Sequence, residues 1–230
     1  MLNRPMLRNF DDHPPFCYAE YRSTRLRSPN QPLVSIVKTL GEVTGPGPVW
    51  SRLSEEDADL TTNARTGQPA MGARTLVTGR VCDEHGVAQP GAVIEIWQAN
   101  AAGRYLHPKE TEYDAPLDPN FLGVGQCRAD AQGGFRFTTI RPGPYPWGNH
   151  ENAWRPAHIH LSIYGPALAT RLVTQFYFPD DPLLALDPIF LSTPVHARER
   201  LIARYDHEVT EPGWALGYRF DIVLRGGFGP

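Results

Sequence analysis

From residue 73 onward, short runs of alternating apolar and polar residues follow one another, separated by turns rich in glycine and proline. Residues 75–82 (TLVTGRVC) and 92–98 (AVIEIWQ) show this alternation, and the turn DEHG follows the first run. Successive side chains of a β-strand point to opposite faces, so these runs predict strands with one buried face. The chain holds 23 prolines and 21 glycines among its 230 residues. That content, about a fifth of the chain, favours short elements joined by many shaped loops.

Four further runs complete the expected strands: 135–140 (FRFTTI), 158–164 (HIHLSIY), 171–178 (RLVTQFYF) and 218–224 (YRFDIVL). One helix is expected over 194–205, with Thr193 as its N-cap and Pro194 at its first position. This pattern predicts an all-β fold, a β-sandwich of short, mostly antiparallel strands with long loops and one short late helix.

The first 72 residues have a different character. Proline-rich segments interrupt them, and the apolar run 33–37 is their only strand-like part. Such a segment buries little of itself. We therefore expect residues 1–72 to form an extended N-terminal arm that packs on the core or on a partner subunit, and residues 73–230 to form the sandwich domain.

Charge and cysteine content exclude several classes of protein. The 22 basic and 25 acidic residues give a formal net charge of −3, which offers no electrostatic basis for binding nucleic acid or an anionic membrane. Cys17, Cys82 and Cys127 are widely spaced and contain no CxxC pair, so we expect reduced thiols in a cytoplasmic protein. The N-terminus lacks the apolar segment of a signal peptide, and no apolar run approaches the ~20 residues of a membrane span.

The motif HIH within the strand expected at 158–164 is a candidate metal-binding pair. Residues two apart in a strand project from the same face, so His158 and His160 can offer two imidazoles to one ion. Histidine has many uses outside metal sites, and a surface or hydrogen-bonded pair is the alternative. The apolar character of this strand and the aromatic-rich loop 141–156 before it favour the metal site.

Two tyrosines, Tyr105 and Tyr145, are the nearby candidates to complete such a site. No acidic residue has the spacing of a two-His-one-carboxylate iron site. A phenol with a pKa of about 10 becomes a ligand only for a strongly Lewis-acidic ion, and tyrosine is a known ligand of iron. Two phenolates and two neutral imidazoles would leave ferric iron with one positive charge. Because a packed, hydrogen-bonded aromatic explains either tyrosine alone, the case depends on all four residues together.

Longer motifs resemble the intradiol ring-cleaving dioxygenase family. Residues 77–105 (VTGRVCDEHGVAQPGAVIEIWQANAAGRY) resemble that family's signature, and similar segments extend over nearly the whole chain: RSPNQPLVSI, YDAPLDPNFLGVGQC, TIRPGPYPW, WRPAHIH, LVTQFYFPDDPL and YRFDIVLRG. The resemblance implies that Fe(III) is bound by Tyr145 and His160 as axial ligands and by Tyr105 and His158 as equatorial ligands.

The same resemblance implies roles for the residues around the iron. Arg155 would stabilise negative charge on the substrate ring, a structural salt bridge being its alternative role, and Tyr145 would take a substrate proton. The pocket walls would be formed by Tyr21, Trp147, Gln175 and Ile189.

The implied activity is the insertion of both atoms of O₂ into protocatechuate (3,4-dihydroxybenzoate), giving 3-carboxy-cis,cis-muconate. The implied partner is a homologous α subunit that lacks iron ligands, in a hetero-oligomer of αβ units. Two alternatives remain. One is the same chemistry on catechol, hydroxyquinol or another dihydroxybenzoate, and the other is a non-catalytic β-sandwich subunit.

Overall fold

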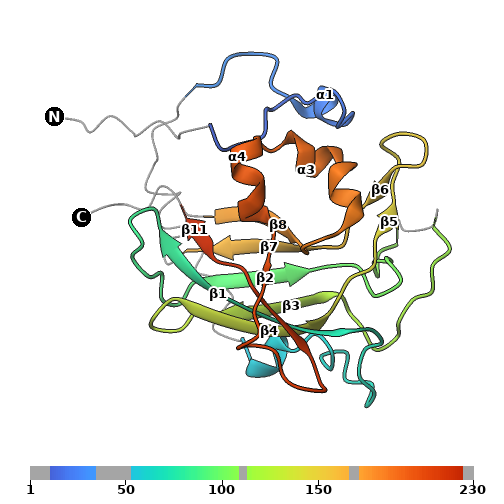
Figure 1. The fold of residues 1–230 in the computed structure, drawn as a ribbon, viewed down its shortest axis with the longest axis vertical. Helices are drawn as coiled ribbons and strands as arrows, with labels where there is room; N and C mark the ends of the chain where they lie inside the picture. The colour runs from blue at the N-terminus through green and yellow to red at the C-terminus, as the bar shows by residue number, and fades with distance from the viewer. Residues whose placement is uncertain (1–10, 35–52, 109–112, 166–170, 225–230) are drawn as a thin grey trace.

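A computed structural model of the chain describes residues 11–34, 53–108, 113–165 and 171–224. Two β-sheets make up the body of the molecule, with short helices and long loops at their margins (Figure 1). Most strand pairs are antiparallel. The predicted all-β sandwich of short strands is therefore confirmed. Among the described residues, no helix has the length and apolar character needed to span a bilayer.

The first sheet is organised around its longest strand, β1. This strand pairs antiparallel with β4, and parallel with β10 over its first half and with β11 at its end. A short strand, β9, closes the edge beside β10. The five strands are β1 (Arg74–Asp83), β4 (Gly134–Ile140), β9 (Arg204–Tyr205), β10 (Leu216–Arg219) and β11 (Ile222–Leu224).

The last strand, expected as one run over 218–224, is divided in two. The backbone N–H of Phe220 donates to the carbonyl of Thr78 at 2.8 Å, between the pairing of β10 and that of β11. At this crossing the chains approach so closely that a Cβ atom on Gly79 would lie 1.9 Å from the Phe220 carbonyl oxygen. The prediction of one continuous strand is wrong because this local contact interrupts the regular ladder.

The second sheet has the order β3–β2–β7–β8, with antiparallel pairs throughout. Its third strand matches the expected range 158–164. The first strand, β3, was not predicted, because its residues show no apolar alternation. Beside this sheet, two short strands form a separate ribbon. The bounds are β2 (Val93–Trp97), β3 (Val124–Arg128), β7 (His158–Tyr164), β8 (Arg171–Tyr177), β5 (Tyr145–Pro146) and β6 (Trp154–Arg155).

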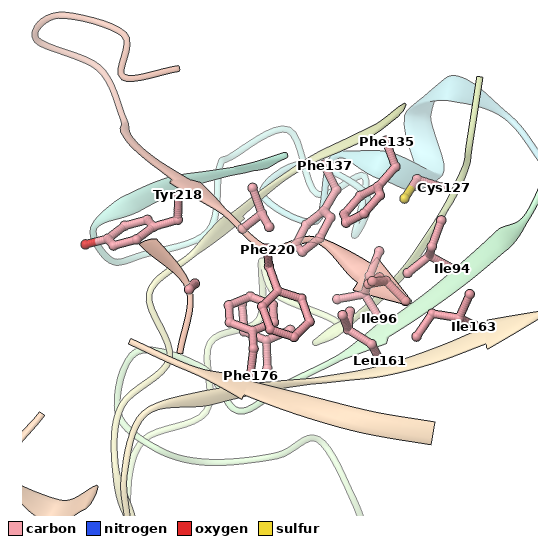
Figure 2. Close-up of a cluster of buried hydrophobic side chains, with 14 of the residues drawn as sticks. Ile94, Ile96, Cys127, Phe135, Phe137, Leu161, Ile163, Phe176, Tyr218 and Phe220 are labelled. Carbon is pink, nitrogen blue, oxygen red and sulfur yellow. The ribbon is translucent and has the colours of Figure 1, made fainter. Parts of the chain in front are cut away.

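The hydrophobic core lies between the two sheets. In Figure 2, aromatic side chains of β4 and of the β10–β11 segment lie near aliphatic side chains of β2 and β7. The rings of Phe176 and Phe220 stack across the layers, with 4.9 Å between their centroids. In β7, Leu161 and Ile163 belong to this core, so His158 and His160 project from the opposite face of the sheet.

Short helical segments follow β8 in place of the single helix expected over 194–205. They are η3 (Pro182–Ala185), α3 (Pro188–Ser192), α4 (Val195–Arg198) and η4 (Glu199–Leu201). Pro194 is the N-cap of α4, and Thr193 is the C-cap of α3. The helical prediction over 194–205 is wrong in length because the following residues pair with strands. Ala203 N donates to the Tyr177 carbonyl at 2.8 Å, and Arg204 begins β9.

The described part of residues 1–72 contacts the sandwich at several places. Leu60, two residues after η2 (Glu55–Ala58), is fully buried in the core, and its N–H donates to the Thr138 carbonyl at 2.9 Å. The segment around α1 (Thr24–Arg27) lies beside α3 and α4 in Figure 1. Of the apolar run 33–37, only the exposed residues Leu33 and Val34 lie within the described residues.

Candidate metal centre

The outer face of the β2–β7–β8 sheet carries a row of polar and aromatic side chains. Strand pairing aligns Trp97 of β2, His160 of β7 and Gln175 of β8. Two residues away, His158 is opposite Tyr177. The neighbouring residues of β7 face the core, so the strand alternation itself brings both histidines to this outer face.

Three donor atoms converge above this row. The Nε2 atom of His158 lies 3.2 Å from Nε2 of His160 and 3.3 Å from the hydroxyl oxygen of Tyr145. Two ligands held at ~2.0–2.1 Å from one ion, at angles near those of common metal sites, are about 3.0–3.4 Å apart. The Tyr105 ring completes the group, since its centroid is 5.4 Å from that of Tyr145 and 6.4 Å from that of His160. The donor atoms of Tyr145, His158 and His160 are thus spaced as ligands of one metal ion would be, and the Tyr105 ring packs beside them.

Both histidines are held in the neutral form that binds metals. Burial, together with the charge of Arg155, lowers the pKa of His160 to about 4. Burial, Arg155 and His160 lower the pKa of His158 well below its ordinary 6.5. Nδ1 of His158 lies 2.6 Å from the Pro156 carbonyl, and donation of its proton there leaves the Nε2 lone pair free for a ligand bond. The Trp97 ring stacks on His160, with 4.8 Å between centroids and 3° between planes.

Local structure positions the two tyrosines. Tyr145 begins β5 and pairs with Arg155 of β6. Tyr105 ends a loop held by Asn100, whose side-chain oxygen accepts from the N–H groups of Ala102 and Arg104 at 2.9 Å each. The two loops meet at Gly103, where an added Cβ atom would lie 2.1 Å from the Pro144 carbonyl oxygen. Gly103 also has a positive φ of 80°, which favours glycine, so this contact requires that residue.

Arg155 lies beside the four candidate ligands and is only 4% exposed. Its Nε forms an ion pair with Oδ1 of the fully buried Asp187 at 3.3 Å, and its guanidinium lies 5.5 Å from the centre of the Trp147 ring. Burial alone would lower the pKa of Arg155, but Asp187, Tyr145 and Tyr177 together raise it, so the group is a permanent cation. Its Nη2 atom is buried and has no hydrogen-bond partner among the described residues. The structural salt bridge that was the alternative role of Arg155 therefore exists. Beyond that salt bridge, the guanidinium still has a buried N–H donor at Nη2.

The predicted pocket residues lie around Arg155. Tyr21 lies against Trp147, with 5.6 Å between ring centroids. Gln175 donates to the hydroxyl of Tyr177, which in turn donates to Asp187. Ile189 is in α3, and its N–H donates to the same Asp187 carboxylate at 3.1 Å.

Sequence reasoning missed four residues that support the site: Trp97, Asn149, Tyr177 and Asp187. The pair Asp187–Pro188 carries a helix-start signal, and Asp187 is indeed the N-cap of α3. No sequence signal links it to Arg155, 32 positions earlier. Within the described part of the chain, no three His, Cys, Asp or Glu side chains gather as a metal site.

The fold and this mixed tyrosine–histidine site define a class of β-sandwich metalloenzyme, and comparison with known proteins identifies its family. A family model described as "Dioxygenase" matches residues 45–226. A second, described as the N-terminal part of the protocatechuate 3,4-dioxygenase β subunit, matches residues 7–39. The chain belongs to the intradiol ring-cleaving dioxygenase family, whose members use non-haem iron.

Individual relatives agree with this assignment. The protocatechuate 3,4-dioxygenase β chain of Burkholderia cepacia is 54% identical over 95% of this chain and 93% of its own length. The α chain of the enzyme from the same organism is 29% identical over 68% of this chain and 75% of its own length. Among solved structures, 3-chlorocatechol 1,2-dioxygenase of Rhodococcus opacus superposes with a TM-score of 0.57 and 25% identity, covering 75% of this chain and 66% of that one.

Proposed function

We propose that this chain binds Fe(III) through Tyr105, Tyr145, His158 and His160 and cleaves protocatechuate between its two hydroxylated carbons, giving 3-carboxy-cis,cis-muconate. The observation that carries the proposal is that Nε2 of His158 lies 3.2 Å from Nε2 of His160 and 3.3 Å from the Tyr145 hydroxyl oxygen, beside the buried Arg155. The high identity to the Burkholderia cepacia β chain over nearly its full length supports the same substrate.

Ferric iron, when bound, supplies the Lewis acidity that stabilises the catechol as a dianion and lets O₂ react at its ring. The protein supplies the remaining functions. The Tyr145 phenolate oxygen accepts a proton from the catechol. Arg155 offers a buried donor to negative charge on the ring, and in such a water-poor site a donor of this kind is worth more than in water. Tyr21, Trp147, Gln175 and Ile189 orient the ring.

We also propose a homologous α subunit as partner, in a hetero-oligomer of αβ units in the cytoplasm. Apolar side chains of the arm support this: Phe16, Leu33 and Val34 are 52%, 59% and 83% exposed. Phe10 and Trp50, two further apolar residues of the arm that we expect to contact the partner, lie outside the described residues. Exposed apolar side chains that gather on one segment indicate an interaction surface. The division into an arm over 1–72 and a catalytic sandwich over 73–230 is part of this proposal.

The function is tested by co-expressing the chain with an α subunit, measuring its metal content, and following O₂ uptake and product with protocatechuate. We expect about one iron per chain, a broad visible tyrosinate-to-iron absorption that shifts on adding substrate, and the muconate product. His160→Ala should lose most of the iron.

The substrate assignment is tested separately with catechol and hydroxyquinol. Faster turnover of either would move the chain to the alternative substrate class while leaving the chemistry in place. A colourless protein containing zinc, or an iron protein without ring cleavage, would contradict the proposed activity.

A further inference from the structure

One buried carboxylate joins three parts of the site that come from separate elements. Asp187 is 0% exposed and lies at the start of α3. Its Oδ1 is 3.3 Å from Nε of Arg155 and accepts from the N–H of Ile189 at 3.1 Å. Its Oδ2 accepts from the hydroxyl of Tyr177 at 3.1 Å. Both oxygens are therefore committed to groups of the site.

The hydrogen bonds around this carboxylate have a fixed direction. Gln175 donates to the Tyr177 hydroxyl, so that hydroxyl gives its own proton to Asp187. Burial, followed by the charge of Asp187, raises the pKa of Tyr177, which keeps the phenol protonated as a donor. Hydrogen bonds thus link Gln175 to Tyr177 and Tyr177 to Asp187, and Asp187 also forms the ion pair with Arg155.

We propose that Asp187 is the positioning residue for Arg155: it holds the guanidinium by Nε and so directs the buried Nη2 donor toward negative charge on the substrate. Through Tyr177 it also fixes the amide of Gln175. The inference rests on the proposed function and extends it to residues that touch neither metal nor substrate.

Two features favour a positioning role over simple charge balance. A cation that only neutralised a buried acid would use its donors on that acid. Among the described residues, however, the buried Nη2 has no hydrogen-bond partner, and Nε meets Asp187 as an ion pair at 3.3 Å without a hydrogen bond. The Trp147 ring, 5.5 Å from the guanidinium, supports its second side. An arginine held by Nε on one side and by an aromatic face on the other has little freedom to rotate, which is the preorganisation that catalysis requires.

The test is a double-mutant cycle in the iron-loaded αβ enzyme, with Asp187→Asn, Arg155→Ala and the pair together. The amide keeps the acceptor that caps α3 but removes the charge. We expect Asp187→Asn to retain iron and its visible band, to leave KM for protocatechuate within about threefold, and to lower kcat by about 10–100-fold. In the Arg155→Ala background the same substitution should change kcat by less than about twofold, because its effect passes through the guanidinium.

Tyr177→Phe gives a second measurement that leaves the charge of Asp187 in place. It should lower kcat by about threefold to tenfold in the native background and by clearly less after Arg155→Ala, where only its contact with Gln175 remains to be lost. Tyr218→Phe is the matched control, because Tyr218 is also a buried tyrosine but lies in the first sheet. It should leave kcat and KM unchanged.

Thermal unfolding of the iron-free variants provides a readout that does not depend on turnover. Asp187→Asn should lower the melting temperature less after Arg155→Ala than before, since the two residues form a pair. The positioning role would be overturned if each substitution, Asp187→Asn or Tyr177→Phe, lowered kcat by the same factor in the Arg155→Ala background as in the native background. A wild-type enzyme that cleaves no catechol would instead refute the proposed function.

Discussion

Burial and the charge of Arg155 set the protonation state of the two histidines at the candidate metal centre. The lowered pKa values of His158 and His160 keep both imidazoles neutral and able to bind a metal. The cation that contributes to this effect is Arg155, which Asp187 in turn keeps charged. A permanent cation beside two neutral imidazoles and two phenols suits a site that must stabilise an anionic substrate.

Tyr145 is expected to be dispensable for folding and essential for turnover. Tyr145→Phe leaves the two histidines and Tyr105 to bind iron, but removes the oxygen that accepts the catechol proton. We expect iron content to stay above half of the wild-type value while kcat falls by about 10²–10⁴-fold, the usual size of a general-base contribution. Metal analysis and O₂ uptake measure the two effects. Tyr164→Phe, at the other end of β7, is the control and should leave both unchanged.

Arg155→Ala should affect both catalysis and stability. Loss of one donor to developing negative charge typically lowers kcat by about 10²–10³-fold. The substitution also strands the fully buried Asp187 carboxylate, and breaking such a buried pair costs about 3–5 kcal/mol. Steady-state kinetics and denaturant unfolding measure the two losses. A normal kcat with a raised KM would instead make Arg155 a group that binds the substrate carboxylate.

At the scale of elements, two features outside the ligand strand support the site. The unpredicted strand β3 places Cys127 in the hydrophobic core, opposite Ile94 of β2. The loop between β5 and β6 carries the buried Asn149, which joins the N-terminal arm to the candidate metal centre. Its side-chain oxygen accepts from the N–H of Arg22 at 3.0 Å, and its amide donates to the carbonyl of Glu20 at 2.8 Å. These contacts place Tyr21 against Trp147.

Cys127 makes stability sensitive to alkali. Burial raises the pKa of its thiol from an ordinary 9.0 to about 12. The unfolded chain therefore releases this proton at lower pH than the folded chain. The stability from the buried neutral thiol is complete below pH 9.0 and is lost as pH rises toward about 12. Denaturant unfolding at several pH values should show a steeper decline for wild type than for Cys127→Ala. Cys17→Ser, at an exposed position, should decline like wild type.

Asn149→Ala should loosen the arm without disturbing the metal. The variant removes both hydrogen bonds to the arm, each of which contributes about 0.5–1.5 kcal/mol. We expect trypsin to cleave faster after Arg22, Arg25 or Arg27, and KM for protocatechuate to rise by about threefold to tenfold because Tyr21 loses its support. Iron content should not change. Unchanged cleavage and KM, equal to those of the exposed neighbour Glu151→Ala, would show that Asn149 does not hold the arm.

At the scale of the whole molecule, the sandwich buries its core between two sheets, but the arm leaves apolar side chains exposed. Phe16, Leu33 and Val34 are exposed on the segment that precedes the sandwich. The candidate metal centre lies on an outer sheet face, so the residues proposed to line its pocket come from β8, from loops, from α3 and from the arm, and not from the core. We therefore propose that the enzyme depends on a partner subunit that covers the arm.

Expression without an α subunit should therefore give a poorly behaved protein. We expect self-association or low solubility and less than a tenth of the activity of the co-expressed complex, because an uncovered apolar surface favours non-specific contacts. Light scattering after size-exclusion chromatography measures the assembly, and O₂ uptake measures the activity. A monodisperse monomer of 25.7 kDa with full protocatechuate cleavage would contradict the need for a partner.

Several features could be predicted from the sequence because they depend on local geometry. Alternating side chains in β7 place His158 and His160 on one face of whatever sheet contains them. Alternation also predicted β1, β2, β4 and β8 to within about two residues of their bounds, since one buried face leaves a period of two. The positions of Tyr105 and Tyr145 were inferred from resemblance, because local geometry does not say which distant loops meet.

Other features of the fold and of the site were decided only by the tertiary structure. The residues Thr193 and Pro194 do mark the start of a helix, but the hydrogen bond from Ala203 to the Tyr177 carbonyl keeps that helix from reaching residue 205. Strand β3 has exposed and half-buried residues without alternation, so only its partner β2 defines it. The ion pair between Arg155 and Asp187 forms only because the chain after β8 brings the start of α3 next to β6. Two charged residues that are far apart in the sequence produce no periodic pattern there, because the path of the chain between them decides whether they meet.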